Sequence, residues 1–168
     1  MARPARRRRQ PLNVALRPFD AGDSEWIDGW LGSVAASVGY KMNGGSPGEW
    51  LRGRLARERH LRVAVIERDG RAAGVIAYRM RAPRRNAAMI ELVATSPSEA
   101  RRGTGTAAAA LVQEFLRTEG VRVAYAPAPA VHGIDVYFWI RLGYRPLPRG
   151  EWPCAVDGVA WMRRDLAV

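Results

Sequence analysis

The 168-residue sequence predicts a mixed α/β fold (α+β in character), and two observations support this prediction. Apolar residues alternate on both sides of the pair Asp69-Gly70, which is the pattern of a β-hairpin with a tight two-residue turn. Apolar residues recur at helical spacing in segments before and after this hairpin. The expected order is β-α-α-β-β-β-α-β-α-β-β, which differs from a regular alternation of strands and helices.

The first part of the chain predicts one strand and two helices. Residues 13–19 (NVALRPF) have the composition of a strand. A helix follows, for which Asp23 or Ser24 is the expected cap. The second helix begins at residues 46–49 (SPGE), which combine a capping box with proline at the first helical position.

The rest of the chain predicts further strands and two helices, separated by Gly- and Pro-containing turns. The helix of 104–118 is the longest and is stopped by Gly120. The expected elements are a hairpin over 61–80, a strand over 87–95, a helix over 104–118, a strand over 121–126, a short helix near 134–142, and two final strands within 143–148 and 156–166.

The formal net charge is +11, and the five arginines among the first ten residues contribute +5 of it. Lys41 is the only lysine among the 27 basic residues. We expect residues 1–11 to form a basic, disordered arm and residues 12–168 to form a single domain. Nucleic-acid binding is expected only through this arm, because neutralising phosphates requires such a cluster of cations.

Composition also excludes several classes of protein. No run approaches the ~18–20 apolar residues of a membrane span, and no apolar segment of a secretory signal follows the N-terminal arginines. The single cysteine, Cys154, excludes an internal disulfide framework and a cysteine-based zinc site. We therefore expect a cytoplasmic protein that has no membrane segment and no metal.

A glycine-containing turn with two arginines precedes the predicted helix of 104–118. Unpaired N–H groups at a helix N-terminus favour an anion, and glycines allow a ligand to approach the backbone. Arg101 and Arg102 add charged donors. The turn predicts a phosphate or pyrophosphate site, with an ordinary turn at the start of a helix as the alternative. It lacks the lysine of a Walker A loop, and Ala108 occupies the third glycine position of a Rossmann turn.

Two motifs resemble the GNAT superfamily of acetyl-CoA-dependent N-acetyltransferases, over a region from about residue 13 to the C-terminus. The family pattern Arg/Gln-x-x-Gly-x-Gly/Ala fits residues 102–107 (RGTGTA), and counting from Pro97 places Ala100 at its first position instead. Residues 137–144 (YFWIRLGY) are similar to the family's late aromatic-x-x-Leu-Gly-Phe/Tyr segment. The resemblance implies a central, mostly antiparallel, splayed sheet of about 6–7 strands flanked by about four helices.

The resemblance implies acetyl-CoA as the acyl donor. In the family, the pantetheine arm bonds the backbone in the gap between the fourth and fifth strands, and the pyrophosphate lies on the glycine turn. His132 falls where the family often places a CoA-contacting asparagine, and Trp139 is expected to form a packing wall for the cofactor. The residues implied to contact the donor are Val93, Ala94, Thr95, Arg101, Arg102, Gly103, Thr104, Gly105, Thr106, His132 and Trp139.

Glu91 is the candidate general base, because it is the only acidic residue in the strand of 87–95. In a regular strand it would share a face with Val93 and Thr95. Partial desolvation among apolar neighbours would raise the pKa of this carboxyl toward a useful range, and Glu91 could act through a water. The alternative is a solvent-facing or arginine-paired glutamate.

The candidate general acid departs from the family pattern. The usual acid is a tyrosine four residues before the glycine that corresponds to Gly143, and this sequence has Trp139 there. Tyr137, two residues earlier, is the candidate replacement, although it lies on a different helical face. Tyr125, on the strand of 121–126, is a second option.

The resemblance predicts transfer of an acetyl group to a primary amine by direct attack on the thioester. The expected partner is a small-molecule amine or a protein amine, and a homodimer is compatible with the sequence. Acidic residues of the first two helices would attract a cationic acceptor, or else form a solvated face: Asp23, Glu25, Asp28 and Glu49. The alternative is a catalytically degenerate GNAT-like module that binds CoA or a protein, which the missing tyrosine favours.

Overall fold

The computed structural model describes residues 13–38, 42, 44–130 and 133–166. Its seven strands form one sheet in the order β1-β2-β3-β4-β5-β7-β6, and β4 and β5 are the parallel pair among the described strands. The mixed α/β class predicted from the sequence is confirmed. The strands are β1 (Val14–Pro18), β2 (Leu61–Arg68), β3 (Arg71–Met80), β4 (Ala87–Thr95), β5 (Val123–Pro129), β6 (Arg145–Pro146) and β7 (Val159–Asp165).

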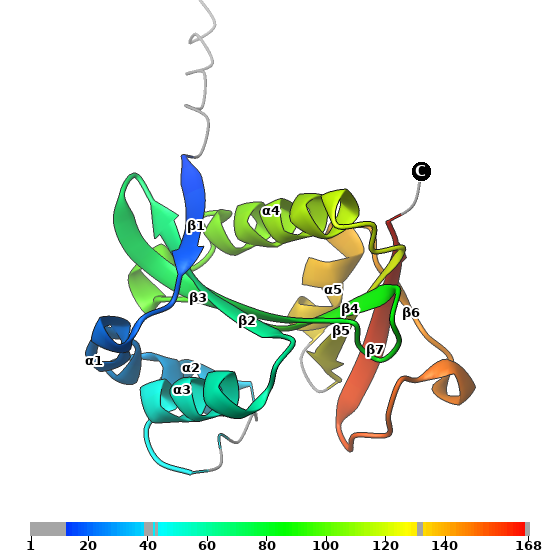
Figure 1. Ribbon diagram of the computed structural model, residues 1–168, viewed down its shortest axis with the longest axis horizontal. Coiled ribbons are helices and arrows are strands. Elements are labelled where there is room, and N and C mark those ends of the chain that lie inside the picture. Colours follow the sequence, from blue (N-terminus) through cyan, green and yellow to red (C-terminus); the bar gives the residue numbers. More distant parts are fainter. Residues whose placement is uncertain (1–12, 39–41, 43, 131–132, 167–168) are drawn as a thin grey trace, which may run out of the picture.

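Helices cover both faces of the sheet, with α1–α3 on one face and α4 on the other (Figure 1). Each face has its own apolar core. Ile27 and Leu51 pack with β2 and β3 on the α1–α3 side, whereas Leu116 and Trp139 pack on the α4 side. The helices are α1 (Ser24–Asp28), α2 (Leu31–Ser37), α3 (Pro47–Arg57), α4 (Thr104–Thr118) and α5 (Gly133–Arg141).

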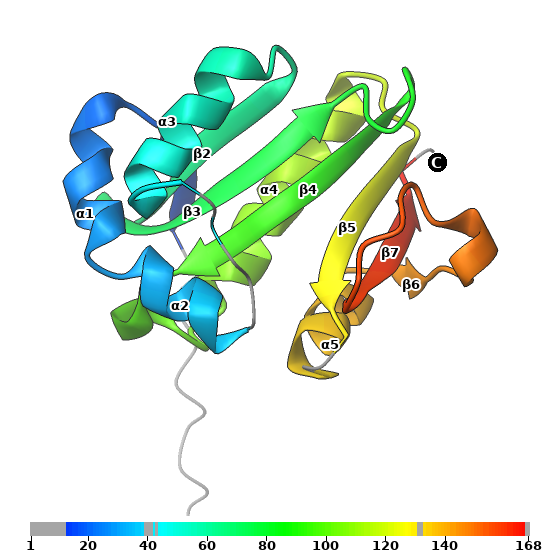
Figure 2. The same ribbon diagram turned by 90° about the horizontal axis from the view of Figure 1, so that it is seen from below.

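The strands β4 and β5 separate soon after they begin (Figure 2). Their parallel pairing runs only from Ala87 opposite Val123 to Met89 opposite Tyr125. Beyond Met89, β4 keeps its antiparallel partner β3 and β5 keeps its antiparallel partner β7. The sheet therefore splays in its middle, and the second half of β4 has one edge without a strand partner among the described residues.

Most elements form where the sequence predicts them, and the first helix is the main difference. Asp69 and Gly70 have φ values of 51° and 75°, as a tight hairpin turn requires. The predicted first helix is divided, because Trp30 leaves the helical region with a φ of −145° while its indole stays buried. Asp23 makes no side-chain capping hydrogen bond to α1, whereas Asp20 caps the short 3-10 turn of residues 21–23 that precedes α1.

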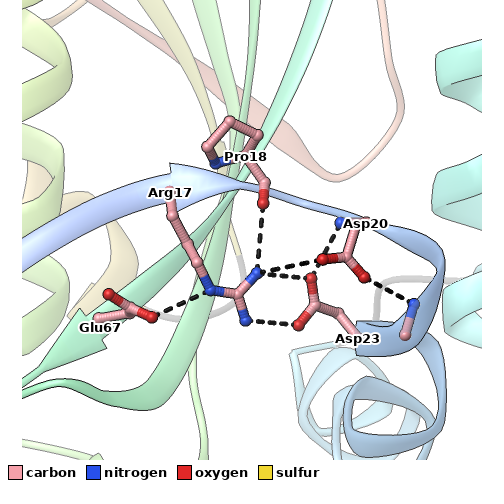
Figure 3. A network of polar contacts seen from close by, with 6 residues as sticks. Arg17, Pro18, Asp20, Asp23 and Glu67 are labelled. Atoms are coloured by element: carbon pink, nitrogen blue, oxygen red, sulfur yellow. Dashed lines mark hydrogen bonds and ion pairs between the residues drawn. The ribbon is translucent and has the colours of Figure 1, made fainter.

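Asp23 instead belongs to an ion-pair network around Arg17 (Figure 3). Arg17 Nη2 lies 2.6 Å from Asp23 Oδ1, and Arg17 Nε lies 3.0 Å from Glu67 Oε1. The hydrogen bond from Arg17 lowers the pKa of the buried Asp23 carboxyl below its ordinary value of 3.8. The network ties β1 to β2 and to the first helical turn.

Candidate cofactor and acceptor site

The N-terminus of α4 has no side-chain cap. Its N-cap residue, Gly103, has a φ of 83°, a left-handed conformation that glycine adopts without a Cβ penalty. The amides of the first helical turn have no acceptor within the helix, and the helix dipole adds partial positive charge there. Arg101 and Arg102 lie exposed directly before this turn. The α4 N-terminus therefore has the donors and the charge to bind an anion.

Glu99 anchors this turn to the β2–β3 hairpin. Its Oε2 accepts hydrogen bonds from Arg68 Nη1 at 3.1 Å and from Thr104 Oγ1 at 3.4 Å, and its Oε1 accepts one from Arg102 Nη1 at 3.4 Å. Thr104 is only 1% exposed. Its hydroxyl bonds Glu99 and is therefore not free to bind a ligand.

The free edge of β4 ends beside this turn. Val93 and Thr95 pair with Ile76 and Gly74 of β3, while their other edge faces the gap that β5 leaves open. A Cβ added to Gly105 would lie 3.5 Å from Val93 Cγ1 and 3.6 Å from Thr95 Cγ2. An extended ligand that bonds this edge would therefore reach the open N-terminus of α4.

A β-bulge at Glu91 changes which face this residue occupies. In the register of β3 and β4, Tyr78 lies opposite Ile90 and Ala77 lies opposite Leu92, which leaves Glu91 as the extra residue. Val93 packs into the α4-side core, whereas the Glu91 carboxylate bonds to Arg54 on α3. The expectation that Glu91 shares a face with Val93 is therefore wrong, because the bulge shifts the alternation by one residue.

Glu91 is one of four charged side chains that form a closed cluster, called the quartet here: Arg54, Glu58, Arg79 and Glu91. Glu91 Oε2 lies 2.6 Å from Arg54 Nη2, and Glu91 Oε1 lies 2.7 Å from Arg79 Nε. Glu58 bonds to the same two arginines, and the hydrogen bond from Arg54 lowers the pKa of Glu58. The Glu91 side chain is 16% exposed. Glu91 is thus an arginine-paired glutamate.

The candidate residues of α5 are placed very differently from one another. Tyr137 is 59% exposed, while Trp139 is 5% exposed and packs edge-to-face at 4.9 Å from the ring of Tyr144. Burial raises the pKa of the Tyr144 hydroxyl. Trp139 is therefore a core side chain, and its role as a wall for the cofactor stays a prediction. His132 lies outside the described residues.

Most of the acidic residues expected to attract an acceptor have structural partners. Asp23 pairs with Arg17, and Asp28 Oδ1 accepts a hydrogen bond of 2.6 Å from Gly48 N at the start of α3. Glu49 completes the capping box of α3 by accepting from Ser46 N. These carboxylates stabilise helix starts and an ion pair, so they give no support to a cationic acceptor site on these helices.

Sequence reasoning missed three members of the quartet and the anchoring role of Glu99. Arg54 and Glu58 have the i,i+4 spacing of a helical ion pair, which was the one available signal. Arg79 reaches Glu91 only through the bulged register of β3 and β4. Glu99 meets Arg68 only because the hairpin turn lies beside the start of α4. Both contacts join distant parts of the sequence.

The described part of the chain contains no group of three or more His, Cys, Asp and Glu side chains arranged to hold a metal ion. Within the same residues, no helix combines the length and the apolar character that crossing a bilayer requires.

The splayed sheet and the open helix N-terminus define a protein suited to an extended ligand that carries an anionic end. A family model described as "Acetyltransferase (GNAT) family" matches residues 26–143. The chain therefore belongs to the GNAT acetyltransferase family, as its two motifs predict. No match was found among curated protein sequences.

Several solved structures are similar to this chain, and three of them overlap with most of it. An acetyltransferase from Thermus thermophilus has a TM-score of 0.73 at 19% identity, covering 90% of this chain and 96% of its own. The PaiA N-acetyltransferase from Thermoplasma acidophilum, in complex with coenzyme A, has a TM-score of 0.68 at 11% identity. The match covers 91% of this chain and 99% of that protein. N-acetylglutamate synthase from Neisseria gonorrhoeae, with coenzyme A and N-acetyl-glutamate, has a TM-score of 0.72 at 17% identity. The match covers 95% of this chain and 36% of that protein. These likenesses show the fold.

Proposed function

We propose that the protein is an N-acetyltransferase that transfers an acetyl group from acetyl-CoA to a primary amine by direct attack. One observation carries this proposal: the unpaired edge of β4 leads to the uncapped N-terminus of α4. An extended arm with a pyrophosphate at one end matches both parts of this site. The neighbours solved with coenzyme A share the fold and support the choice of donor.

The donor would bind along β4 with its pyrophosphate at the α4 N-terminus. Main-chain groups of residues 93–95 would bond the pantetheine arm as a neighbouring strand would. The amides of residues 103–106 would hold the pyrophosphate, with Arg101 and Arg102 as additional charged donors. This arrangement fixes the thioester in the gap, so an amine held nearby reacts as in an intramolecular step.

Transfer requires a neutral amine and a donor for the oxygen of the thioester carbonyl. A main-chain N–H on the free edge of β4 would donate to that oxygen as negative charge develops on it. The attacking nitrogen forms a bond to the acetyl carbon, the carbon–sulfur bond breaks, and CoA leaves as a thiolate. The amine proton leaves through water to a base, and a proton returned to sulfur completes the exchange.

Glu91 is the proposed base and Tyr137 the proposed acid. The bulge directs Glu91 toward α3, where Arg54 and Arg79 keep it in a fixed position. Because each oxygen of the Glu91 carboxylate already bonds an arginine, a water would carry the proton from the ammonium form of the acceptor to Glu91. Tyr137, on the exposed side of α5, would donate through solvent. The acceptor would be a small-molecule or protein amine in the cytoplasm.

Release of free thiol from acetyl-CoA, measured over a panel of primary amines, tests the proposal. We expect turnover with at least one primary amine and none with its tertiary analogue. Glu91→Gln should lower kcat about a hundredfold without changing the Kd for acetyl-CoA, because only the proton transfer is affected. Glu58→Gln removes a carboxylate from the same quartet and serves as the matched control. An equal loss in both variants would mean that Glu91 acts through the quartet and not as a base.

The degenerate binding module is the second candidate function. Two observations favour it: Glu91 is held by two arginines, and Trp139 occupies the family's tyrosine position as a buried core residue. This candidate predicts that acetyl-CoA binds while no amine of the panel is acetylated. Turnover that depends on Glu91 would exclude it.

A further inference from the structure

A hollow of about 340 Å³ lies beside the glycine turn, on the side of the β2–β3 hairpin. It shares no lining residue with the edge of β4 at residues 93–95 or with Gly105, so it is separate from the gap that β5 leaves open. The residues around it are Arg68, Asp69, Arg71, Ala72, Ala73, Glu99 and Arg102. Two parts of the chain far apart in sequence therefore form one polar depression next to the anion site.

The hollow has an excess of positive charge, because three arginines face two carboxylates. Glu99 binds Arg68 and Arg102, and Asp69 lies 3.8 Å from Arg68 Nε. The side chain of Arg71, exposed at the start of β3, makes no hydrogen bond or ion pair with any other described residue. Among the described residues, no carboxylate therefore neutralises the charge of the Arg71 guanidinium in the hollow.

The position of Arg102 connects the hollow with the turn. Arg102 immediately precedes Gly103, and its Nη1 lies 3.4 Å from Glu99 Oε1 within the lining of the hollow. An anionic ligand at the α4 N-terminus would therefore have a second cationic site within reach on this side. CoA differs from a simple pyrophosphate in carrying a phosphate monoester on the ribose that follows the pyrophosphate.

We propose that this hollow binds the ribose 3′-phosphate of CoA, with Arg71 as the residue that distinguishes CoA from its 3′-dephospho form. The inference rests on the proposed donor. A phosphate monoester carries more than one negative charge near neutral pH and accepts several charge-assisted hydrogen bonds, which is what an unpaired arginine provides. Arg68 is held in place by Glu99 and would line the site without moving.

Calorimetric titration of the full chain with CoA and with 3′-dephospho-CoA tests this site. We expect the wild type to bind CoA about tenfold more tightly than the dephospho form, since hydrogen bonds to charged groups are strong. Arg71→Ala should remove most of this preference by weakening CoA alone, and Arg71→Glu should reverse it. Arg85→Ala, which removes an exposed arginine beyond the opposite end of β3, is the matched control and should change neither Kd.

The outcomes separate this inference from the proposed function. Equal weakening of both ligands by Arg71→Ala, or an unchanged preference for CoA, would overturn the 3′-phosphate site while leaving the donor assignment intact. A wild-type protein that binds neither ligand would overturn the donor and this site together. An unchanged melting temperature would show that the variants remain folded.

Discussion

The starts of α3 and α4 are both helix N-termini, yet the chain treats them in opposite ways. At α3, Ser46 Oγ accepts from Glu49 N, Glu49 accepts from Ser46 N, and Asp28 accepts from Gly48 N. At α4, the N-cap is Gly103 and no side chain caps the helix. The orphan amides of a first helical turn are therefore satisfied internally at one helix and left to solvent or a ligand at the other.

This difference shows that sequence around a helix start can distinguish a structural N-terminus from a binding one. Glycine in place of a capping side chain costs a helix only roughly a few tenths of a kcal/mol, so the start of α4 at Gly103 can stay uncapped and leave its amides to an anion. The α4 start also lies at the end of an unpaired strand edge, whereas α3 begins after a loop. An uncapped helix start therefore indicates a binding site when a second feature that can hold a ligand, such as this strand edge, lies beside it.

The largest effect is expected from Gly105→Ala. The added Cβ makes ordinary contacts with Val93, Thr95 and Phe138, so the protein should fold with an unchanged or slightly raised melting temperature. The same methyl would occupy the corner between β4 and α4 that the donor needs. Acetyl-CoA should bind about thirty- to a hundredfold more weakly by calorimetry, roughly 2–3 kcal/mol. Gly32→Ala in α2 is the matched control, and tight binding by Gly105→Ala would place the donor elsewhere.

The next effect is expected from replacing both arginines of the turn. Arg101→Ala with Arg102→Ala should weaken acetyl-CoA about tenfold at low salt, because two charged donors are lost while the backbone amides remain. The salt dependence of the Kd should also become shallower than in the wild type. A double variant with wild-type affinity and salt dependence would restrict the anion site to the backbone.

Ser46→Ala should produce the complementary result at α3. Losing the capping hydroxyl is expected to lower the free energy of unfolding by about 1 kcal/mol, measured in urea. The Kd for acetyl-CoA should not change, because this helix start has no place in the donor site. Weakened donor binding would contradict the separation of a structural and a binding N-terminus.

The smallest effect concerns the short helical turn that Asp20 and Asp23 cap near Arg17. The pKa of Asp23 is lowered in the folded state, so its contribution is complete above the ordinary value of 3.8 and is lost as the pH falls through the lower folded value. Asp23→Asn should lower stability at pH 7 by less than about 1 kcal/mol, since Arg17 is partly exposed. The two proteins should converge in acid unfolding. A constant difference at all pH values would assign the effect to packing.

Local sequence signals predicted most of the fold. The Asp69-Gly70 turn, the capping box at Ser46 and the helix of 104–118 all depend on neighbours within a few residues, and each forms as expected. The division of the first helix at Trp30 was missed, because burial of that indole is decided by packing against other elements and not by helical periodicity.

The candidate site could be predicted from the sequence only where its residues are contiguous, as the residues of the predicted fold elements are. The glycine turn was found from its own residues, since an open helix start and its arginines are contiguous in sequence. The environment of Glu91 was not found from the sequence, because a β-bulge moves its side chain to the other face of the sheet. Its partners Arg54 and Arg79 also come from two other elements. A bulge in a strand of ordinary composition leaves no clear sequence signal.

The most direct test of the central claim is to follow backbone amide resonances of the ¹⁵N-labelled protein during titration with CoA. The account predicts large shifts for residues 103–106 at the start of α4 and unchanged signals for residues 48–50 at the start of α3. Saturable shifts confined to α4 and the free edge of β4 would establish the binding N-terminus. Shifts of equal size at both helices, or none at α4, would contradict the account.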